Sequence, residues 1–165
     1  MTLIKNDQNQ AFDAIHTILN SLDALVYVSD LHNYELLYLN DYGTAIWGKP
    51  TGKKCYQLLQ AGQNSPCAFC TNHKLIGPEG DATGVHVWEF QNTQNKRWYQ
   101  CRDQAIRWTD GRLVRIEIAT DITERKHMEQ ALIEAKFIAE RLANTDELTK
   151  LYNRRAFFHF GHPIA

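Results

Sequence analysis

The spacing of hydrophobic residues changes several times along the chain. Near the N-terminus, apolar residues recur at steps of three and four, which is typical of one apolar face of a helix. They are Phe12, Ile15, Leu19 and Leu22. Two short segments follow, residues 24–30 and 34–40, both rich in β-branched and aromatic residues. A short polar stretch separates them, so the pattern predicts a helix over residues 8–22 and then a strand hairpin.

Residues 41–78 have a different pattern, in which short apolar clusters are broken repeatedly by glycine and proline. This pattern predicts several short helices and loops that pack over a sheet. Three longer segments with strand character then follow, at residues 84–91, 97–108 and 113–120. Asp110-Gly111 separates the last two, and an Asp-Gly pair between strands is typical of a tight hairpin.

The last of these strands alternates between apolar and charged residues. Val114, Ile116 and Ile118 alternate with Arg115 and Glu117. Because successive side chains of a strand point to opposite faces, we expect one buried apolar face and one charged face in water. The complete order predicts an α+β fold: a five-stranded antiparallel sheet with helices on one face.

Residues 121–144 contain no glycine or proline and are rich in charged residues. The apolar positions step by four, three, four and three residues: Met128, Leu132, Ala135, Ala139 and Leu142. This spacing predicts a coiled-coil-type helix with a weak seam. Asp121 and Glu124 have the spacing of a capping box, so we expect this helix to begin at Asp121.

Composition and charge narrow the function classes. The 165 residues are 44% hydrophobic and 22% charged, with a formal net charge of -1. No basic patch suggests nucleic-acid binding. No apolar run approaches the roughly 18 residues of a membrane-spanning helix, and the N-terminus lacks a signal-peptide pattern. We therefore expect a cytoplasmic protein without nucleic-acid partners or a membrane segment.

Two parts of the sequence resemble known families. The segment Asp121-Ile122-Thr123, which ends the last strand and leads into a charged helix, resembles the exit of PAS domains. The order of elements over residues 10–124 is also the PAS order. This resemblance implies a sensory or dimerisation domain with a small-molecule pocket between sheet and helices.

The second resemblance is more specific. Residues 144–157, NTDELTKLYNRRAF, resemble the opening of a GGDEF domain through the pattern D-x-L-T-x-L-x-N-R-R. This resemblance implies a diguanylate cyclase, which condenses two GTP molecules into cyclic di-GMP with divalent metal. The sequence ends at Ala165, before the glycine-rich GG-(D/E)-EF turn. We therefore expect this fragment to be non-catalytic and to come from a longer bacterial signalling protein.

The four cysteines are candidates for redox chemistry or packing. Cys55, Cys67 and Cys70 are the redox candidates, and Cys67, Cys70 and His73 would share one face if that segment were helical. A lone C-x2-C is a weak metal signal, so we expect no metal site and regard buried structural thiols as the first alternative. Cys55 also invites comparison with the LOV subfamily of PAS domains. Its neighbours Lys54 and Tyr56 depart from the N-C-R pattern there, so flavin is not expected.

A ligand pocket is predicted from aromatic, histidine and thiol side chains near the expected sheet. The candidates are Trp47, His73, His86, Trp88, Cys101 and Ile116. His73 and His86 raise the question of a haem ligand, but a lone histidine is more often a surface residue, so haem is not expected. The identity of any small-molecule ligand stays open.

The resulting hypothesis has four segments and one direction of signalling. We expect a flanking helix (1–22), a PAS sensor domain (23–123), a linker helix (124–144) and the start of a GGDEF domain (145–165). The chain would form a homodimer and pass a signal to the cyclase. The transmitting residues would be Asp121, Ile122, Thr123, Met128, Leu132, Ala135 and Leu142. The alternatives are a ligand-free interaction module and a cysteine-based redox sensor.

Overall fold

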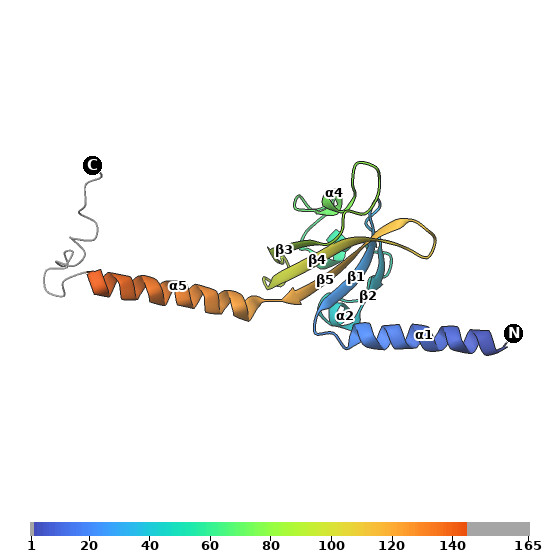
Figure 1. Cartoon of the computed structure of the whole chain (residues 1–165), viewed down its shortest axis with the longest axis horizontal. Coiled ribbons are helices and arrows are strands. Elements are labelled where there is room, and N and C mark those ends of the chain that lie inside the picture. Colours follow the sequence, from blue (N-terminus) through green and yellow to red (C-terminus); the bar gives the residue numbers. More distant parts are fainter. Residues whose placement is uncertain (1, 145–165) are drawn as a thin grey trace. The chain divides into compact units, whose positions relative to one another are not determined.

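The computed structural model describes residues 2–144, and side chains from residue 10 onward (Figure 1). The chain divides into two compact units, of which the first ends at Ile122 and the second begins at Thr123. The elements of the first unit are α1 (Thr2–Asn20), β1 (Leu25–Asp30), β2 (Leu36–Leu39), α2 (Asp41–Trp47), α3 (Cys55–Leu59), α4 (Asn72–Leu75), β3 (His86–Gln91), β4 (Trp98–Arg107) and β5 (Leu113–Asp121). The described part of the second unit is helix α5 (Thr123–Asn144).

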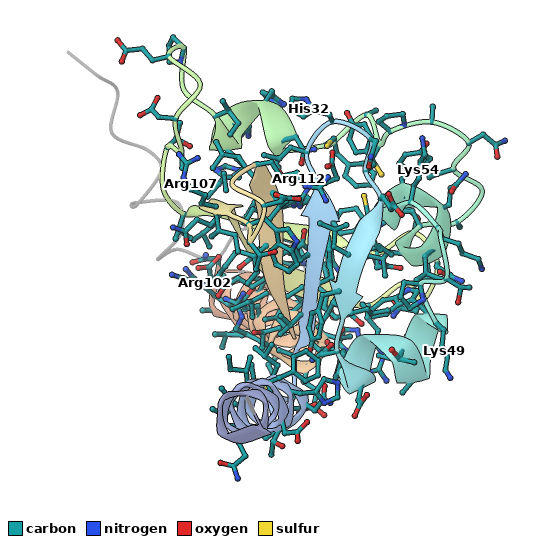
Figure 2. The ribbon with its side chains drawn as sticks, turned by 90° about the vertical axis from the view of Figure 1, so that its right-hand side faces the viewer. His32, Lys49, Lys54, Arg102, Arg107 and Arg112 are labelled. Atoms are coloured by element: carbon teal, nitrogen blue, oxygen red, sulfur yellow. The ribbon has the colours of Figure 1, made fainter. Side chains whose placement is uncertain are left out.

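The five strands form one antiparallel sheet in the order β2-β1-β5-β4-β3. The first and last strands of the unit are therefore neighbours, and Tyr27 of β1 lies opposite Glu117 of β5. At the far end of β1, Arg112 pairs with Asp30, and Figure 2 labels this arginine close to the turn that holds His32. The predicted α+β fold with a five-stranded antiparallel sheet is confirmed.

One face of the sheet carries the short helices. Along β4 the residues Tyr99, Cys101 and Ala105 are buried, while Arg102 between them is exposed. The buried side chains pack against Trp47 of α2 and the leucines of α3 and α4. Figure 2 shows Arg102 on the side of the sheet opposite Lys49 and Lys54, which come from the α2–α3 region. The core therefore lies between the sheet and these helices.

Asn40 joins three elements of the first unit. Its side chain is fully buried, and its Oδ1 accepts hydrogen bonds from the backbone N–H of Val26 (3.0 Å) and of Gly43 (3.1 Å). Its Nδ2 donates to the carbonyl oxygens of Ala24 (2.8 Å) and Leu19 (3.2 Å). Asn40 thus caps α2 and at the same time fixes β1 and the end of α1 to the same point.

Two helices have large exposed apolar side chains. Phe12, Ile15 and Ile18 of α1 are exposed. No residue in the described helix α5 is buried, and its Met128, Leu132 and Leu142 are 65%, 71% and 67% exposed. Among residues 2–144, no helix is both long enough and apolar enough to span a bilayer.

Two expectations about β5 and its exit are corrected. Asp121, expected to begin the helix, is the last residue of β5, and its carboxylate accepts a hydrogen bond from Arg97 at 2.7 Å. Arg115 and Glu117, expected in water, are 5% and 6% exposed and face the helices. Burial is tolerated because each finds oppositely charged or hydrogen-bonding partners on neighbouring strands.

Candidate functional site

A cavity of about 50 Å³ lies between the sheet and the helices. Its walls come from β1, β3, β4 and β5 of the sheet, from α2 and α3, and from the loop before α4. Eight aromatic side chains are among the described residues that line it. A volume of this size holds roughly three or four waters. The aromatic side chains therefore fill most of the space between sheet and helices.

The aromatic wall on the β3 side is a packed group of three rings. The ring centroids of Phe69 and Phe90 are 4.5 Å apart, and those of Trp88 and Phe90 are 5.4 Å apart. Trp88 and Phe90 are two residues apart on β3, so both point to the same face of the sheet. Beside them, Tyr99 of β4 pairs in register with Phe90, and the Trp47 and Tyr99 ring centroids lie 6.0 Å apart. These contacts are typical aromatic packing distances.

All four cysteines line this one cavity, as free thiols. Burial raises the pKa of the Cys55 thiol to about 12 and that of the Cys67 thiol to about 11. Burial also raises the pKa of Cys101. Because the thiolate is the reactive form, these three thiols are poorly suited to rapid oxidation at neutral pH. Among the described residues, no group of three or more histidine, cysteine or carboxylate side chains could hold a metal ion.

The segment that carries Cys67 and Cys70 is a turn rather than a helix. The N–H of Cys70 donates to the carbonyl oxygen of Cys67 at 3.0 Å, and α4 begins only at Asn72. The two thiols therefore face the cavity while His73, in α4, is exposed. The expected common face of Cys67, Cys70 and His73 does not form, because the helix starts after both cysteines.

The floor of the cavity is a buried charge cluster. Arg115 and Glu117 lie two residues apart on β5 and pair with each other. The Arg115 Nη2 atom also lies 3.0 Å from the Asp103 Oδ2 atom, on β4. The Tyr27 hydroxyl donates to Glu117 at 2.7 Å from the other side, on β1. The three central strands thus meet at this cluster.

Asp103 connects the cluster to the cavity wall. Its Oδ2 atom accepts hydrogen bonds from the Thr71 hydroxyl and from the indole N–H of Trp88, both at 2.6 Å. The Arg115 Nη1 atom donates to the side-chain oxygen of Asn72 at 3.2 Å. The cluster therefore holds β3 and the start of α4 in place as well as the central strands.

Burial decides the protonation of this cluster. It raises the pKa of Glu117 to about 7; Arg115 counteracts this rise, and the neighbouring Asp103 adds to it. The cluster buries two carboxyl groups but only one guanidinium group. One carboxyl group therefore keeps its proton up to nearly neutral pH.

Three buried polar atoms at this site have no hydrogen-bond partner within the described part of the chain. They are Trp47 Nε1, Asp103 Oδ1 and Arg115 Nε. Trp47 and Arg115 both line the cavity. Buried polar atoms are normally paired with protein or water, so the site can form further hydrogen bonds.

The predicted pocket residues separate into two groups. Trp47, Trp88 and Cys101 line the cavity, whereas His73, His86 and Ile116 do not. His86 lies near Lys74, with the His86 Nε2 and Lys74 Nζ atoms 3.5 Å apart. Ile116 lies between two cavity-lining residues of β5, so it points to the other face of the sheet. A ligand-binding role for any of these residues stays a prediction.

Sequence reasoning missed Arg115, Glu117 and Asp103. A signal was present on β4, where Asp103 has the same strand parity as the buried Tyr99 and Cys101. A charged residue on the buried face of a central strand indicates a partner across the sheet.

Comparisons with known proteins find similar solved structures but no matching sequence family. No protein-family model matches the chain, and no curated protein matches it either. The PAS domain of Bordetella pertussis BvgS matches 79% of this chain and 98% of its own, at 17% identity and a TM-score of 0.45. An RNA-binding light-oxygen-voltage receptor matches 75% of this chain at 21% identity, with a TM-score of 0.53.

The fold is PAS-like. The sheet order, the short helices on one face and the helix that follows the last strand all agree with this assignment. The chain spans 36% of the light-oxygen-voltage receptor.

Proposed function

We propose that this chain is the sensory module of a homodimeric signalling protein and controls a C-terminal diguanylate cyclase. The observation that carries the proposal is the position of β5. This strand supplies Arg115 and Glu117 to the cavity, and its last residue, Asp121, lies two positions before α5 begins. A change at the cavity floor therefore acts on the strand that continues into the linker helix.

The end of β5 is held by a small number of contacts. Arg97 pairs with Asp121 at 2.7 Å, and the N–H of Ile122 donates to the carbonyl oxygen of Trp98 at 2.8 Å. A signal would change the strength or geometry of these contacts through β4 and β5. It can do so only if the ligand binds two arrangements of the sheet with different affinity.

The exposed apolar side chains of the linker helix favour a second copy of the chain as the dimer partner. The exposed Met128, Leu132 and Leu142 continue through Ala135 and Ala139 as a seam with coiled-coil spacing. Exposed apolar side chains at this spacing are stabilised when an identical helix packs on them. The small alanines make the seam weak, which suits a connector that changes its packing.

The output assignment depends on the sequence resemblance at residues 144–157. All but the first of these residues lie outside the described residues. The resemblance supports a cyclase domain after the linker helix. The present chain would bind a ligand and transmit the signal to the cyclase.

The dimer is tested with the 165-residue chain by sedimentation velocity over a wide concentration range. Leu132→Glu places a charge in the seam and should shift the chain to monomer. Gln130→Glu, on the other side of the helix, is the matched control and should leave the dimer intact. In the full-length protein, Leu132→Glu should lower cyclic di-GMP production. A chain that stays monomeric at high concentration, or full cyclase activity in Leu132→Glu, would overturn the proposal.

A second candidate is a ligand-free interaction module, and the small cavity favours it. About 50 Å³ is well below the roughly 150 Å³ of an apolar cavity that admits benzene. Native mass spectrometry of freshly purified protein discriminates the two. A bound small molecule supports sensing, whereas a chain of unmodified mass that still dimerises supports the interaction module.

A further inference from the structure

The cavity floor contains more buried acid than base. Asp103 and Glu117 contribute two carboxyl groups, and Arg115 contributes the single guanidinium that contacts both. All three residues are at least nine-tenths buried. Glu117 lines the cavity itself, so the carboxyl group that lacks a counter-charge when it is ionised faces the space that a ligand would occupy.

This imbalance argues against an anionic ligand. Arg115 already uses Nη2 for the two carboxyl groups and Nη1 for Asn72. An anion could hydrogen-bond to the Arg115 Nε atom, which has no partner within the described part of the chain, but it would then compete with two carboxyl groups for a single guanidinium. Burying an additional negative charge beside two carboxyl groups is strongly unfavourable.

The aromatic lining suits a cation. Cations are attracted to the faces of aromatic rings, and cages of such rings bind alkylammonium groups. One cation–π contact is already present at the floor, where the Arg115 guanidinium carbon lies 5.8 Å from the Tyr27 ring centroid. Trp47, Phe69, Trp88 and Phe90 extend the aromatic surface around the remaining space.

We propose that the cavity is a site for a small alkylammonium ion. Its positive charge faces Glu117 and its carbon atoms contact the aromatic rings. The volume of about 50 Å³ sets the size at that of a singly methylated ammonium ion. This proposal names the ligand class for the proposed sensory function. It rests on that function only for the biological use of the ion, because binding itself requires only the cavity.

Binding of such an ion is coupled to a proton. The titratable groups that face Glu117 are Tyr27 on β1, Cys55 on α3, Cys67 in the following loop, Cys101 and Asp103 on β4, and Arg115 on its own strand. Of these, Arg115 supplies the fixed positive charge. Without ligand, the carboxyl group of Glu117 holds a proton below about pH 7. With ligand, the ammonium replaces that proton, which leaves to solvent.

The experiment is a titration of the 165-residue chain with methylammonium chloride, followed by backbone amide NMR at constant ionic strength. Methanol is the neutral probe of similar size, and formate is the anionic probe. We expect methylammonium to shift amides of β4 and β5 and to bind at least about tenfold more tightly than methanol. Formate should cause no saturable shift.

The proton gives a second measurement on the unaltered chain. A ligand that displaces one proton from Glu117 should bind about tenfold more weakly at pH 6 than at pH 8. Glu117→Gln keeps the shape of the side chain and should weaken methylammonium binding by about tenfold while removing the pH dependence. Equal affinity for methanol, saturable binding of formate, or affinity that does not change with pH would each overturn the inference.

The two proposals fail separately. If methylammonium binds with these properties but leaves dimerisation and full-length cyclase output unchanged, the sensory role is lost and the site remains. If the chain dimerises and controls the cyclase but does not bind methylammonium, the ligand class is wrong and the sensory role remains.

Discussion

Tyr27 and Glu117 lie directly opposite each other on β1 and β5, and the Tyr27 hydroxyl donates a hydrogen bond to the Glu117 carboxylate at 2.7 Å. The bond connects the two neighbouring strands at the cavity floor. It also favours the charged form of Glu117, and so opposes the rise in pKa caused by burial.

Tyr27→Phe removes this bond and keeps the ring. We expect the pKa of Glu117 to rise further above 7, because the carboxylate loses a donor. The free energy of unfolding should fall by about 1–3 kcal/mol, the usual loss when a buried acceptor loses its partner. Carbon-13 NMR titration of the glutamate side chains reports the pKa, and urea denaturation reports stability. An unchanged Glu117 titration would contradict the assigned role of Tyr27.

The raised pKa of Glu117 makes stability depend on pH. The folded state holds a proton on Glu117 up to about pH 7, whereas the unfolded chain releases it near 4.5. The contribution of protonated Glu117 to the free energy of unfolding is therefore fully present below about pH 4.5 and is lost as the pH rises to about 7. The slope is at most about 1.4 kcal/mol per pH unit for one proton. Urea denaturation at several pH values checks this, and Glu117→Gln should flatten the curve in this window.

Arg115 is expected to be far more important to stability than an exposed arginine. Arg115→Met leaves two carboxyl groups buried without a cation, which typically lowers the free energy of unfolding by about 3–5 kcal/mol. Arg97→Met is the matched control, because Arg97 also pairs with an aspartate, Asp121, but its side chain is 59% exposed. Its loss should be much smaller, because water screens an exposed ion pair. Similar losses for both variants in urea denaturation would be inconsistent with a buried charge cluster.

The thiols should react slowly with alkylating reagents. At pH 8, Cys55 and Cys67 are almost entirely protonated, because burial raises their pKa values to about 12 and 11. A short pulse of iodoacetamide followed by mass spectrometry should leave both unlabelled in the folded chain. All four cysteines should be labelled in concentrated urea, which serves as the control. Rapid labelling of Cys55 in the folded chain would restore the redox-sensor hypothesis.

The sequence predicts the fold better than it predicts the site. Strand periodicity and the Asp110-Gly111 turn locate β4 and β5, because these signals are local. The cavity depends on which residues of distant strands face each other, and alternation alone does not say which face is buried. On β5 the apolar residues suggested one face, but Arg115 and Glu117 are buried on the other because Asp103 and Tyr27 provide partners.

Local sequence patterns also could not predict that the four thiols line one cavity. Cys55 lies on α3, Cys101 lies on β4, and Cys67 and Cys70 lie in an irregular loop without periodicity. Only the folding of this loop over the sheet brings the four together. Trp47 and Trp88, two of the predicted pocket residues, line the cavity, because large aromatic side chains often pack in or beside a core.

Asn40 provides a test of how the first unit is assembled. Asn40→Ala removes four hydrogen bonds at a fully buried position and leaves the N–H of Val26 and the carbonyl oxygen of Ala24 without their partner. We expect the free energy of unfolding to fall by about 2–4 kcal/mol, more than for an ordinary helix cap, because buried backbone groups lose their partners as well.

Asn20→Ala is the control for this prediction, because Asn20 accepts a single exposed hydrogen bond from the N–H of Asp41 at 2.9 Å, at the start of the same helix. Its loss should stay below about 1 kcal/mol. Hydrogen exchange locates the effect: in Asn40→Ala the amides of Val26 and Gly43 should exchange at least about tenfold faster, whereas Asn20→Ala should leave them protected. If both variants had the same stability, α2 would be capped by contacts other than Asn40, and β1 would not depend on this residue for its attachment to α1.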